Sequence, residues 1–127
     1  PALARAVYEG LCFGLRHIAE TMAERGVVLR NVRIAGGLAR SDLLSAMKSD
    51  ILGRPVFRLA DHELTTLGLA VIAATALGAY RSRAAASEAI VRTGDSFEPA
   101  GDAIRYEAPY RRYLAAVSAL APTFAPP

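Results

Sequence analysis

Two consecutive glycines, Gly36 and Gly37, follow a β-branched stretch and precede Ser41 and Asp42, a pair typical of a helix start. Adjacent glycines let the backbone turn sharply and expose N–H groups that no Cβ covers. A helix N-terminus adds the positive end of its dipole, so the pattern predicts a site for an anion such as a phosphate. It matches neither the P-loop nor the dinucleotide fingerprint. A plain strand-to-helix turn capped by Ser41 explains the same residues, and on the residues alone it is the simpler interpretation.

Other residues that could do chemistry fit structural roles better. His17 and His62 have no acidic or Cys partners at ligand spacing, so no metal site is predicted. Cys12 has no paired His nearby in the sequence and is interpreted as a small buried apolar residue. The helical spacing of Tyr110 and Tyr113 indicates packing rather than stacking on nucleic-acid bases.

The glycine pair must be held by the elements around it, and the first of these is a long helix over residues 3–25. Gly26 is expected to end this helix in the left-handed conformation. Gly10 and Gly14 weaken the helix, so a close packing neighbour is expected on their side. Six apolar residues at helical spacing are expected to form its buried stripe: Leu3, Val7, Leu11, Leu15, Ile18 and Met22.

Residues 27–35 then change to a near-alternating, β-branched pattern that predicts a strand leading into the glycine pair. The helix that Ser41 caps is expected to end at Gly53, and Asp50 within it to accept a structural hydrogen bond. Its predicted buried stripe consists of Leu43, Leu44, Met47, Ile51 and Leu52.

A second strand is predicted at residues 56–59. Residues 65–79 are predicted to form a helix that is apolar on all faces, and such a helix is expected to lie buried at the centre of a domain. The rest of the chain is expected to form a short helix near Ser82, a polar loop over 93–103, a last helix around 110–120 and a tail at 122–127.

This order predicts an α/β domain with helices covering a small sheet. Two short strands do not make a stable sheet by themselves, so we expect further strands of the domain to lie upstream of Pro1.

Composition excludes several classes of protein. The 127 residues are 53% hydrophobic, which suits one folded domain rather than a disordered tail. The single cysteine excludes a disulfide framework and fits a cytoplasmic protein. Leu64 to Tyr80 is too short and too polar for a convincing membrane span. The 15 basic and 12 acidic residues are interleaved, so neither nucleic acid nor a membrane is expected as a partner.

Four blocks of sequence, in this order and spacing, resemble the C-terminal domain of FGGY-type carbohydrate kinases, the group of xylulokinase, gluconokinase and glycerol kinase. The resemblance covers about residues 5–80 and continues more weakly to the Tyr110 helix. The blocks are Arg5 to Arg16, Ala35 to Ser41, Ser49 to Val56 and Glu63 to Ala70.

The resemblance implies part of an actin-like, ribonuclease-H-related ATPase domain over residues 1–121, whose first strands lie upstream. It implies that Gly36 and Gly37 present N–H groups to the phosphates of ATP. Arg40 then occupies a frequent basic position and Ser41 lies beside the adenine. Gly68 matches the family's helix-start motif behind the nucleotide pocket.

Two departures from the family pattern add volume around the adenine site and so affect nucleotide affinity or orientation. Leu38 stands where Gly or Ala is usual, and Leu69 stands in the motif that often has Ala.

The family's catalytic aspartate, its Mg²⁺-linked residues and its sugar contacts match no position in residues 1–127. We therefore expect an ATP- and Mg²⁺-using kinase for a sugar or polyol, with a xylulose-like pentulose favoured, that is inactive as this chain alone. The alternative is a non-catalytic interaction module of the same fold that forms an oligomer, such as a homodimer. A small basic nucleic-acid binder is a third, less favoured interpretation.

Overall fold

The structure is a computed structural model, and it describes residues 2–29, 31–61 and 63–124. Helices, strands and two short 3-10 turns alternate along the chain. They are α1 (Ala2–Glu24), β1 (Val32–Ile34), η1 (Gly37–Arg40), α2 (Asp42–Leu52), β2 (Val56–Leu59), α3 (Leu64–Ala76), α4 (Arg83–Ile90), β3 (Thr93–Phe97), α5 (Ile104–Leu120) and η2 (Ala121–Phe124).

The sheet has three strands in the order β1-β2-β3. β1 and β2 are parallel, with Ile34 opposite Arg58, and β3 runs antiparallel to β2, with Phe97 opposite Val56. Two predictions need correction here. The strand predicted within 27–35 is present but shorter, since among the described residues of that range it comprises Val32–Ile34. The polar loop expected over 93–103 begins with β3. β3 was missed because its residues are polar and mostly exposed, while pairing with the backbone of β2 makes it a strand.

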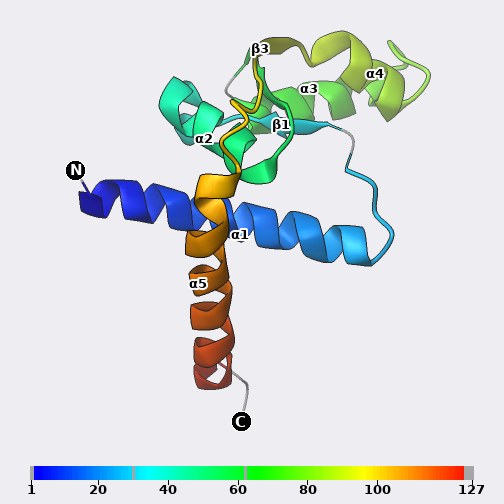
Figure 1. The fold of residues 1–127 in the computed structure, drawn as a ribbon. Coiled ribbons are helices and arrows are strands. Elements are labelled where there is room, and N and C mark those ends of the chain that lie inside the picture. Colours follow the sequence, from blue (N-terminus) through cyan, green and yellow to red (C-terminus); the bar gives the residue numbers. More distant parts are fainter. Residues whose placement is uncertain (1, 30, 62, 125–127) are drawn as a thin grey trace.

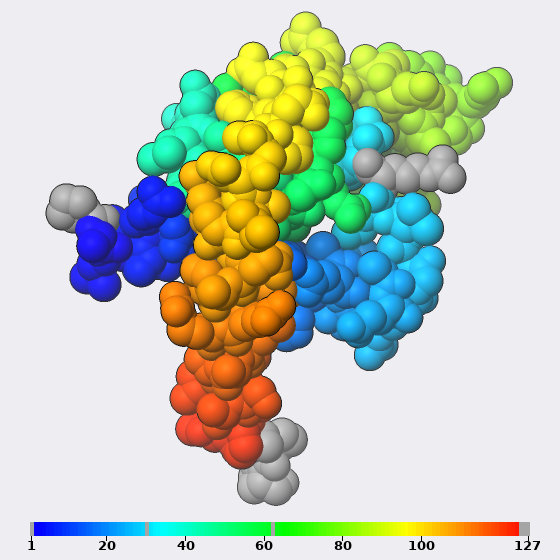
Figure 2. Space-filling view, in the orientation of Figure 1, coloured from blue at the N-terminus to red at the C-terminus, as the bar shows by residue number. Residues whose placement is uncertain are grey.

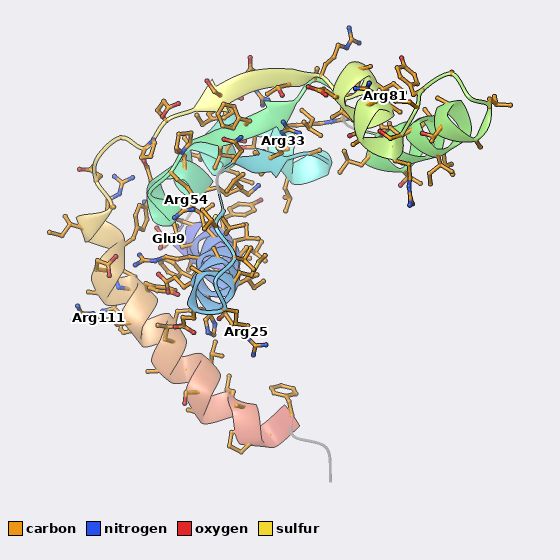
Figure 3. All side chains as sticks on the ribbon, turned by 90° about the vertical axis from the view of Figure 1, so that its right-hand side faces the viewer. Glu9, Arg25, Arg33, Arg54, Arg81 and Arg111 are labelled. Carbon is orange, nitrogen blue, oxygen red and sulfur yellow. The ribbon has the colours of Figure 1, made fainter. Side chains whose placement is uncertain are left out.

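α1 and α5 form the lower half of the molecule as drawn in Figure 1, where α5 crosses α1 and then extends away from it. In the space-filling view of Figure 2, the first turns of α5 lie directly over α1. The sheet, α2 and the α3–α4 pair lie above. Seen from the side, α5 and the α3–α4 pair leave the sheet in different directions (Figure 3). The helices thus do not wrap around one centre.

The hydrophobic core lies where α1, α2 and α5 meet. Phe13 is at its centre, with its ring centroid 5.7 Å from that of Tyr110 and 5.9 Å from that of Tyr113. An added Cβ on Gly14 would lie 3.4 Å from the Tyr113 hydroxyl, so the close neighbour expected beside the two helix glycines is confirmed for Gly14. It is wrong for Gly10, where an added Cβ would meet no heavy atom within 4 Å among the described residues. The buried members are Cys12, Phe13, Met47, Ile51, Tyr106 and Tyr110. The packing roles predicted for Cys12 and for the tyrosines are therefore confirmed.

The expected buried stripe of α1 is, in contrast, exposed. Leu3 keeps 80% of its accessible surface, Ile18 59% and Val7 55%. The buried side of α1 is the one that carries Cys12 and Phe13, because α2 and α5 both pack there. Leu43, which was expected to be buried in α2, is likewise 70% exposed, whereas Leu44, Met47 and Ile51 are buried as predicted. Helical spacing identified apolar faces but not the face that finds a partner.

The apolar helix α3 departs furthest from expectation. It was predicted to be central and buried, but α3, all of whose residues are described, contains no buried residue. Leu69 and Ile72 keep 63% and 56% of their accessible surface. α3 packs on α4, and much of its remaining surface is open.

Polar contacts tie α1, α2 and α5 together around this core. The Asp50 carboxylate accepts the backbone N–H of Ala100 at 2.8 Å and lies 3.2 Å from the guanidinium of Arg105, which confirms its expected structural role. The Tyr110 hydroxyl donates to Glu20 at 2.5 Å. Burial and this hydrogen bond raise the pKa of Tyr110 well above its usual value. For Glu20, burial acts in the opposite direction, but the hydrogen bonds from Tyr110 and Arg16 lower its pKa.

Candidate functional site

The glycine pair forms the turn between β1 and α2. Gly36 has φ 81° and ψ −174°, a backbone conformation that is essentially restricted to glycine. One turn of 3-10 helix, η1, follows, and its first hydrogen bond runs from the N–H of Ala39 to the carbonyl of Gly36 at 3.1 Å. The sharp turn predicted for Gly36 is therefore present.

Ser41 caps α2, as the sequence predicted. Its side chain accepts a hydrogen bond from the backbone N–H of Leu44 at 3.4 Å, and Asp42 lies in the first turn. The buried hydroxyl of Ser45 lies 3.0 Å from the carbonyl of Ser41 and 3.3 Å from that of Ala39. The start of α2 is thus held to the end of η1 by the side chains of Ser41 and Ser45.

The outer side of the turn is open. An added Cβ on Gly36 or Gly37 would meet no heavy atom within 4 Å among the described residues beyond its chain neighbours. Gly37 and Arg40 are exposed, and Leu38 keeps 51% of its accessible surface. With no side chain in the way, a phosphate can approach the backbone of the two glycines closely. A turn that serves only to start a capped helix does not need this open surface. The residues present fit a polyphosphate ligand.

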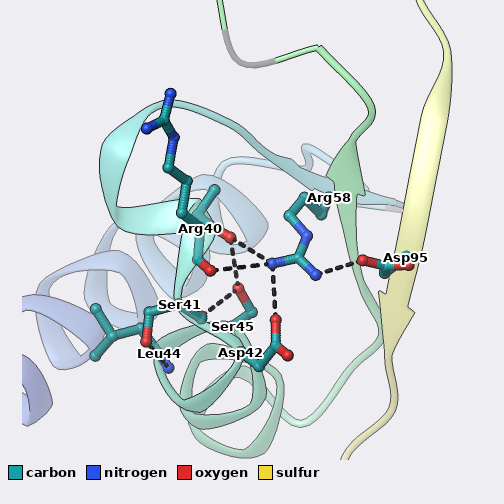
Figure 4. A network of polar contacts seen from close by, with 8 residues as sticks. Arg40, Ser41, Asp42, Leu44, Ser45, Arg58 and Asp95 are labelled. Atoms are coloured by element: carbon teal, nitrogen blue, oxygen red, sulfur yellow. Dashed lines mark hydrogen bonds and ion pairs between the residues drawn. The ribbon is translucent and has the colours of Figure 1, made fainter.

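Arg58 is the residue of this region that the sequence did not reveal as functional. It lies on β2 with its side chain only 14% exposed, and its guanidinium reaches η1, α2 and β3 (Figure 4). Hydrogen bonds to Asp95 and Asp42 raise the pKa of Arg58 further. An arginine inside the otherwise apolar stretch Val56 to Leu59 is a weak sequence signal that could have drawn attention to it.

Gly36, Gly37, Arg40 and Ser41 thus lie together on one turn, while Gly68 lies apart in the sequence on α3. A cavity of about 490 Å³ lies elsewhere, between α1, α2 and α5, where Arg16 and Glu107 line it. Within residues 2–29, 31–61 and 63–124, no group of three or more His, Cys, Asp or Glu side chains could hold a metal ion. In the same residues, no helix has the length and apolar character needed to cross a membrane. His62 lies outside the described residues.

Comparison with known proteins identifies the family. Residues 1–77, well over half of the chain, match the C-terminal domain of the FGGY family of carbohydrate kinases. The chain belongs to this family. The resemblance seen in the four sequence blocks is therefore confirmed, and the glycine turn, Ser41 and Gly68 all lie inside the matched FGGY region.

Individual relatives cover nearly the whole chain. A ribulokinase of Mycolicibacterium smegmatis is 36% identical over 112 residues, which are 87% of this chain and 20% of that protein. A glycerol kinase of Saccharopolyspora erythraea is 36% identical over 121 residues, 91% of this chain and 23% of that protein. The crystal structure of xylulose kinase from Rhodospirillum rubrum matches with a TM-score of 0.78 and 28% identity, over 96% of this chain and 25% of that one.

These matches fix the fold and the family but not the acceptor of the phosphoryl group. The chain has the actin-like ATPase fold of the FGGY kinases, in the form of helices on a small mixed sheet. It spans about a fifth to a quarter of the length of the kinases it matches. A ribulokinase and a glycerol kinase are both 36% identical to it, so the comparisons identify the family but not the substrate.

Proposed function

We propose that this chain is the nucleotide-binding part of an FGGY carbohydrate kinase, with residues 1–121 as a portion of its C-terminal domain. Residues 122–127 are its proposed tail, of which 125–127 lie outside the described residues. The observation that carries the proposal is the open glycine turn at the start of α2. The N–H groups of Gly36 and Gly37 would meet the phosphates of ATP, Arg40 would add positive charge, and Ser41 would lie beside the adenine.

Mg²⁺ would enter with the nucleotide. Mg²⁺ is commonly held by substrate phosphates and one or two carboxylates, with water completing its shell. When bound with ATP, it shields the negative charge of the transferred phosphoryl group. The turn supports this proposal, because it offers open backbone donors for the oxygens of the phosphates that would carry the Mg²⁺.

The proposal is tested by titrating the ¹⁵N-labelled chain with Mg·ATP. We expect chemical-shift changes at Gly36, Gly37, Arg40 and Ser41. Gly53 and Gly101 also have positive φ but lie outside the turn, so they are internal controls in the same spectrum. If the signals of the turn are well dispersed but do not shift at saturating Mg·ATP, nucleotide binding is rejected. The bulk of Leu38 would then be the first candidate for what blocks the site.

Phosphoryl transfer requires several parts acting together, and the nucleotide turn is the one part that this proposal assigns to the chain. We therefore propose that it does not phosphorylate a sugar alone. A kinase assay on the purified chain should show no sugar-dependent ATP turnover, and a Gly36→Ala sample prepared in parallel controls for contaminating kinase. Turnover that disappears in the Gly36→Ala sample would overturn the proposal.

A xylulose-like pentulose is the proposed acceptor in an intact enzyme that contains this domain. Similarity to a ribulokinase and to a xylulose kinase supports a pentulose. A panel of xylulose, ribulose, gluconate and glycerol, compared by kcat/KM on that enzyme, tests the proposal. A preference for glycerol would reject it.

A second candidate function, a non-catalytic interaction module, is favoured by the exposed apolar residues of α1 and α3. Exposed patches of this kind mark surfaces that another chain covers. Light scattering separates the two proposals, because a module that pairs with itself should have at least twice the 13.5 kDa mass of one chain. A monomer that binds Mg·ATP would exclude the module.

A further inference from the structure

One arginine side chain gathers the backbone around the glycine turn. From β2, the Arg58 guanidinium donates to the carbonyls of Ala39 at 3.0 Å and Arg40 at 3.4 Å. It also donates to a carboxylate oxygen of Asp42 at 2.8 Å and to Asp95 on β3. Figure 4 shows these contacts converging on a single side chain.

Arg58 makes these contacts through two nitrogens: Nη1 donates to Ala39, Arg40 and Asp42, sharing its two hydrogens among them, and Nη2 donates to Asp95. A guanidinium can reach both groups of acceptors at once. The planar guanidinium of arginine presents five N–H donors in a fixed fork, whereas lysine presents one compact charge at the end of a flexible stem. The fork is itself held, because Arg58 Cζ lies 5.1 Å from the centroid of the Phe97 ring and the side chain is only 14% exposed. η1, α2 and β3 are thereby attached to one rigid group.

These contacts determine which way two peptide groups face, the Ala39–Arg40 and Arg40–Ser41 groups that follow the glycine pair. In a trans peptide the C=O and the following N–H point in opposite directions. Because Arg58 holds the carbonyls of Ala39 and Arg40 toward β2, the N–H groups of Arg40 and Ser41 are turned away from β2. Two glycines precede this segment, and adjacent glycines by themselves leave a backbone free to adopt many conformations.

Arg58 also balances the negative charge next to the turn. Asp42 and Asp95 are largely exposed carboxylates, with side chains 78% and 68% exposed, and both pair with Arg58. Without the arginine, these two charges would oppose the approach of an anion to the start of α2.

We propose that Arg58 is a positioning residue for the nucleotide: it fixes the glycine turn in its binding conformation through the carbonyls of Ala39 and Arg40, without touching the ligand. This inference rests on the proposed nucleotide-binding function. If loss of Arg58 leaves the binding conformation populated in about a tenth of the molecules, the apparent Kd rises about tenfold.

The test compares Arg58→Gln and Arg58→Lys with the matched control Arg33→Gln. Arg33 (labelled in Figure 3) lies on β1 opposite Phe57, and so on the other face of the sheet from Arg58. We expect the Kd for Mg·ATP to rise about tenfold in Arg58→Gln. Arg58→Lys should recover less than half of that loss in affinity, and Arg33→Gln should bind like the wild type.

A ligand-free measurement separates failure of this inference from failure of the proposed function. The ¹⁵N order parameters of Gly37 and Arg40 should fall from about 0.85 to below about 0.6 in ligand-free Arg58→Gln. This expectation holds whether or not the chain binds Mg·ATP. A wild type that does not bind Mg·ATP rejects the proposed function. Unchanged order parameters would reject the positioning role, because the turn would then be rigid without Arg58. Full recovery of affinity by Arg58→Lys would also reject it, because a positive charge alone would then suffice.

A milder variant keeps the test valid if Arg58→Gln disturbs folding. Asp95→Asn changes an exposed side chain on the edge strand β3 and weakens one anchor of the guanidinium, because it removes the negative charge but keeps an oxygen that can accept the hydrogen bond. The order parameters of the turn should then fall by less than in Arg58→Gln but measurably. A rigid turn in a folded Asp95→Asn chain that also binds Mg·ATP as tightly as the wild type would count against the role.

Discussion

The cluster around Phe13 and the helix α3 are both strongly apolar, yet only the cluster is buried. Phe13 is 5% exposed and is surrounded by side chains from three helices, whereas Leu69 on α3 is 63% exposed. The whole chain exposes 8774 Å², against roughly 6,500 Å² for a compact monomer of its mass. The comparison indicates that stability is concentrated where α1, α2 and α5 meet, and that other apolar faces contribute little to it.

The sharpest test of this comparison truncates the centre of the cluster. Phe13→Ala should lower the free energy of unfolding by about 3–5 kcal/mol, because it removes a buried ring and leaves a cavity among the tyrosines of α5. Urea denaturation followed by circular dichroism measures the change. A loss below about 1 kcal/mol would contradict the conclusion that stability is concentrated in the cluster around Phe13.

What sequence could predict follows the same division. Helix ends with a strong local signal were predictable, as Gly26, Ser41 and Gly53 each adopted the expected role. Ends without one were not: the last helix, expected around 110–120, begins at Ile104, and the helix expected over 65–79 ends at Ala76. Which apolar face becomes buried depends on distant elements, so the stripe through Leu3 and Ile18 was placed on the wrong side of α1. β3 was missed for the same reason, since its partner strand rather than its composition makes it extended.

The candidate site was predictable only in its backbone part. Gly36 and Ser41 carry their roles in their residue types, because a sharp turn favours glycine and an N-cap favours serine. Arg58 lies 18 residues beyond Arg40 in the sequence, and only the parallel pairing of β1 with β2 brings it to the turn.

A second prediction contrasts the two glycines of the turn. Gly36→Ala should cost about 1–3 kcal/mol of stability, since its φ of 81° with ψ of −174° excludes residues with a Cβ. Gly37 lies in η1 without a positive φ and has open space, so Gly37→Ala should change stability by less than about 1 kcal/mol. Both should weaken Mg·ATP binding. Equal stability losses in the two variants would contradict the assigned backbone geometry.

The edge of the cluster should respond to pH. Tyr110 has a raised pKa when folded, so its contribution to stability is complete below about pH 10, where unfolded tyrosine ionises, and is lost as pH rises further. Glu20 has a lowered pKa, so its contribution is present above its unfolded pKa and is lost in acid. Tyr110→Phe should cost about 1 kcal/mol at neutral pH and reduce the loss above pH 10. An unchanged alkaline profile would reject this assignment.

The N-cap at the site should have a smaller effect. Ser41→Ala removes the acceptor for the Leu44 N–H and should cost about 0.5–1 kcal/mol, because at 3.4 Å the cap is long. Ser41→Asp is the matched variant, since aspartate also caps helices and should retain most of the stability. Thermal unfolding of both variants tests the cap, and equal losses would show that the side-chain acceptor is not what stabilises the start of α2.

The smallest expected change in stability is on α3, and it tests most directly the contrast between the buried cluster around Phe13 and the exposed α3. Leu69→Gln should change the free energy of unfolding by less than about 0.5 kcal/mol, since the side chain is 63% exposed and glutamine is a good helix former. Phe13→Gln, a change to the same residue in the cluster, should be severe. If Leu69→Gln instead lost more than about 1 kcal/mol in a concentration-dependent manner, α3 would be covered by a second chain in solution. That result would favour the interaction module over the nucleotide-binding proposal.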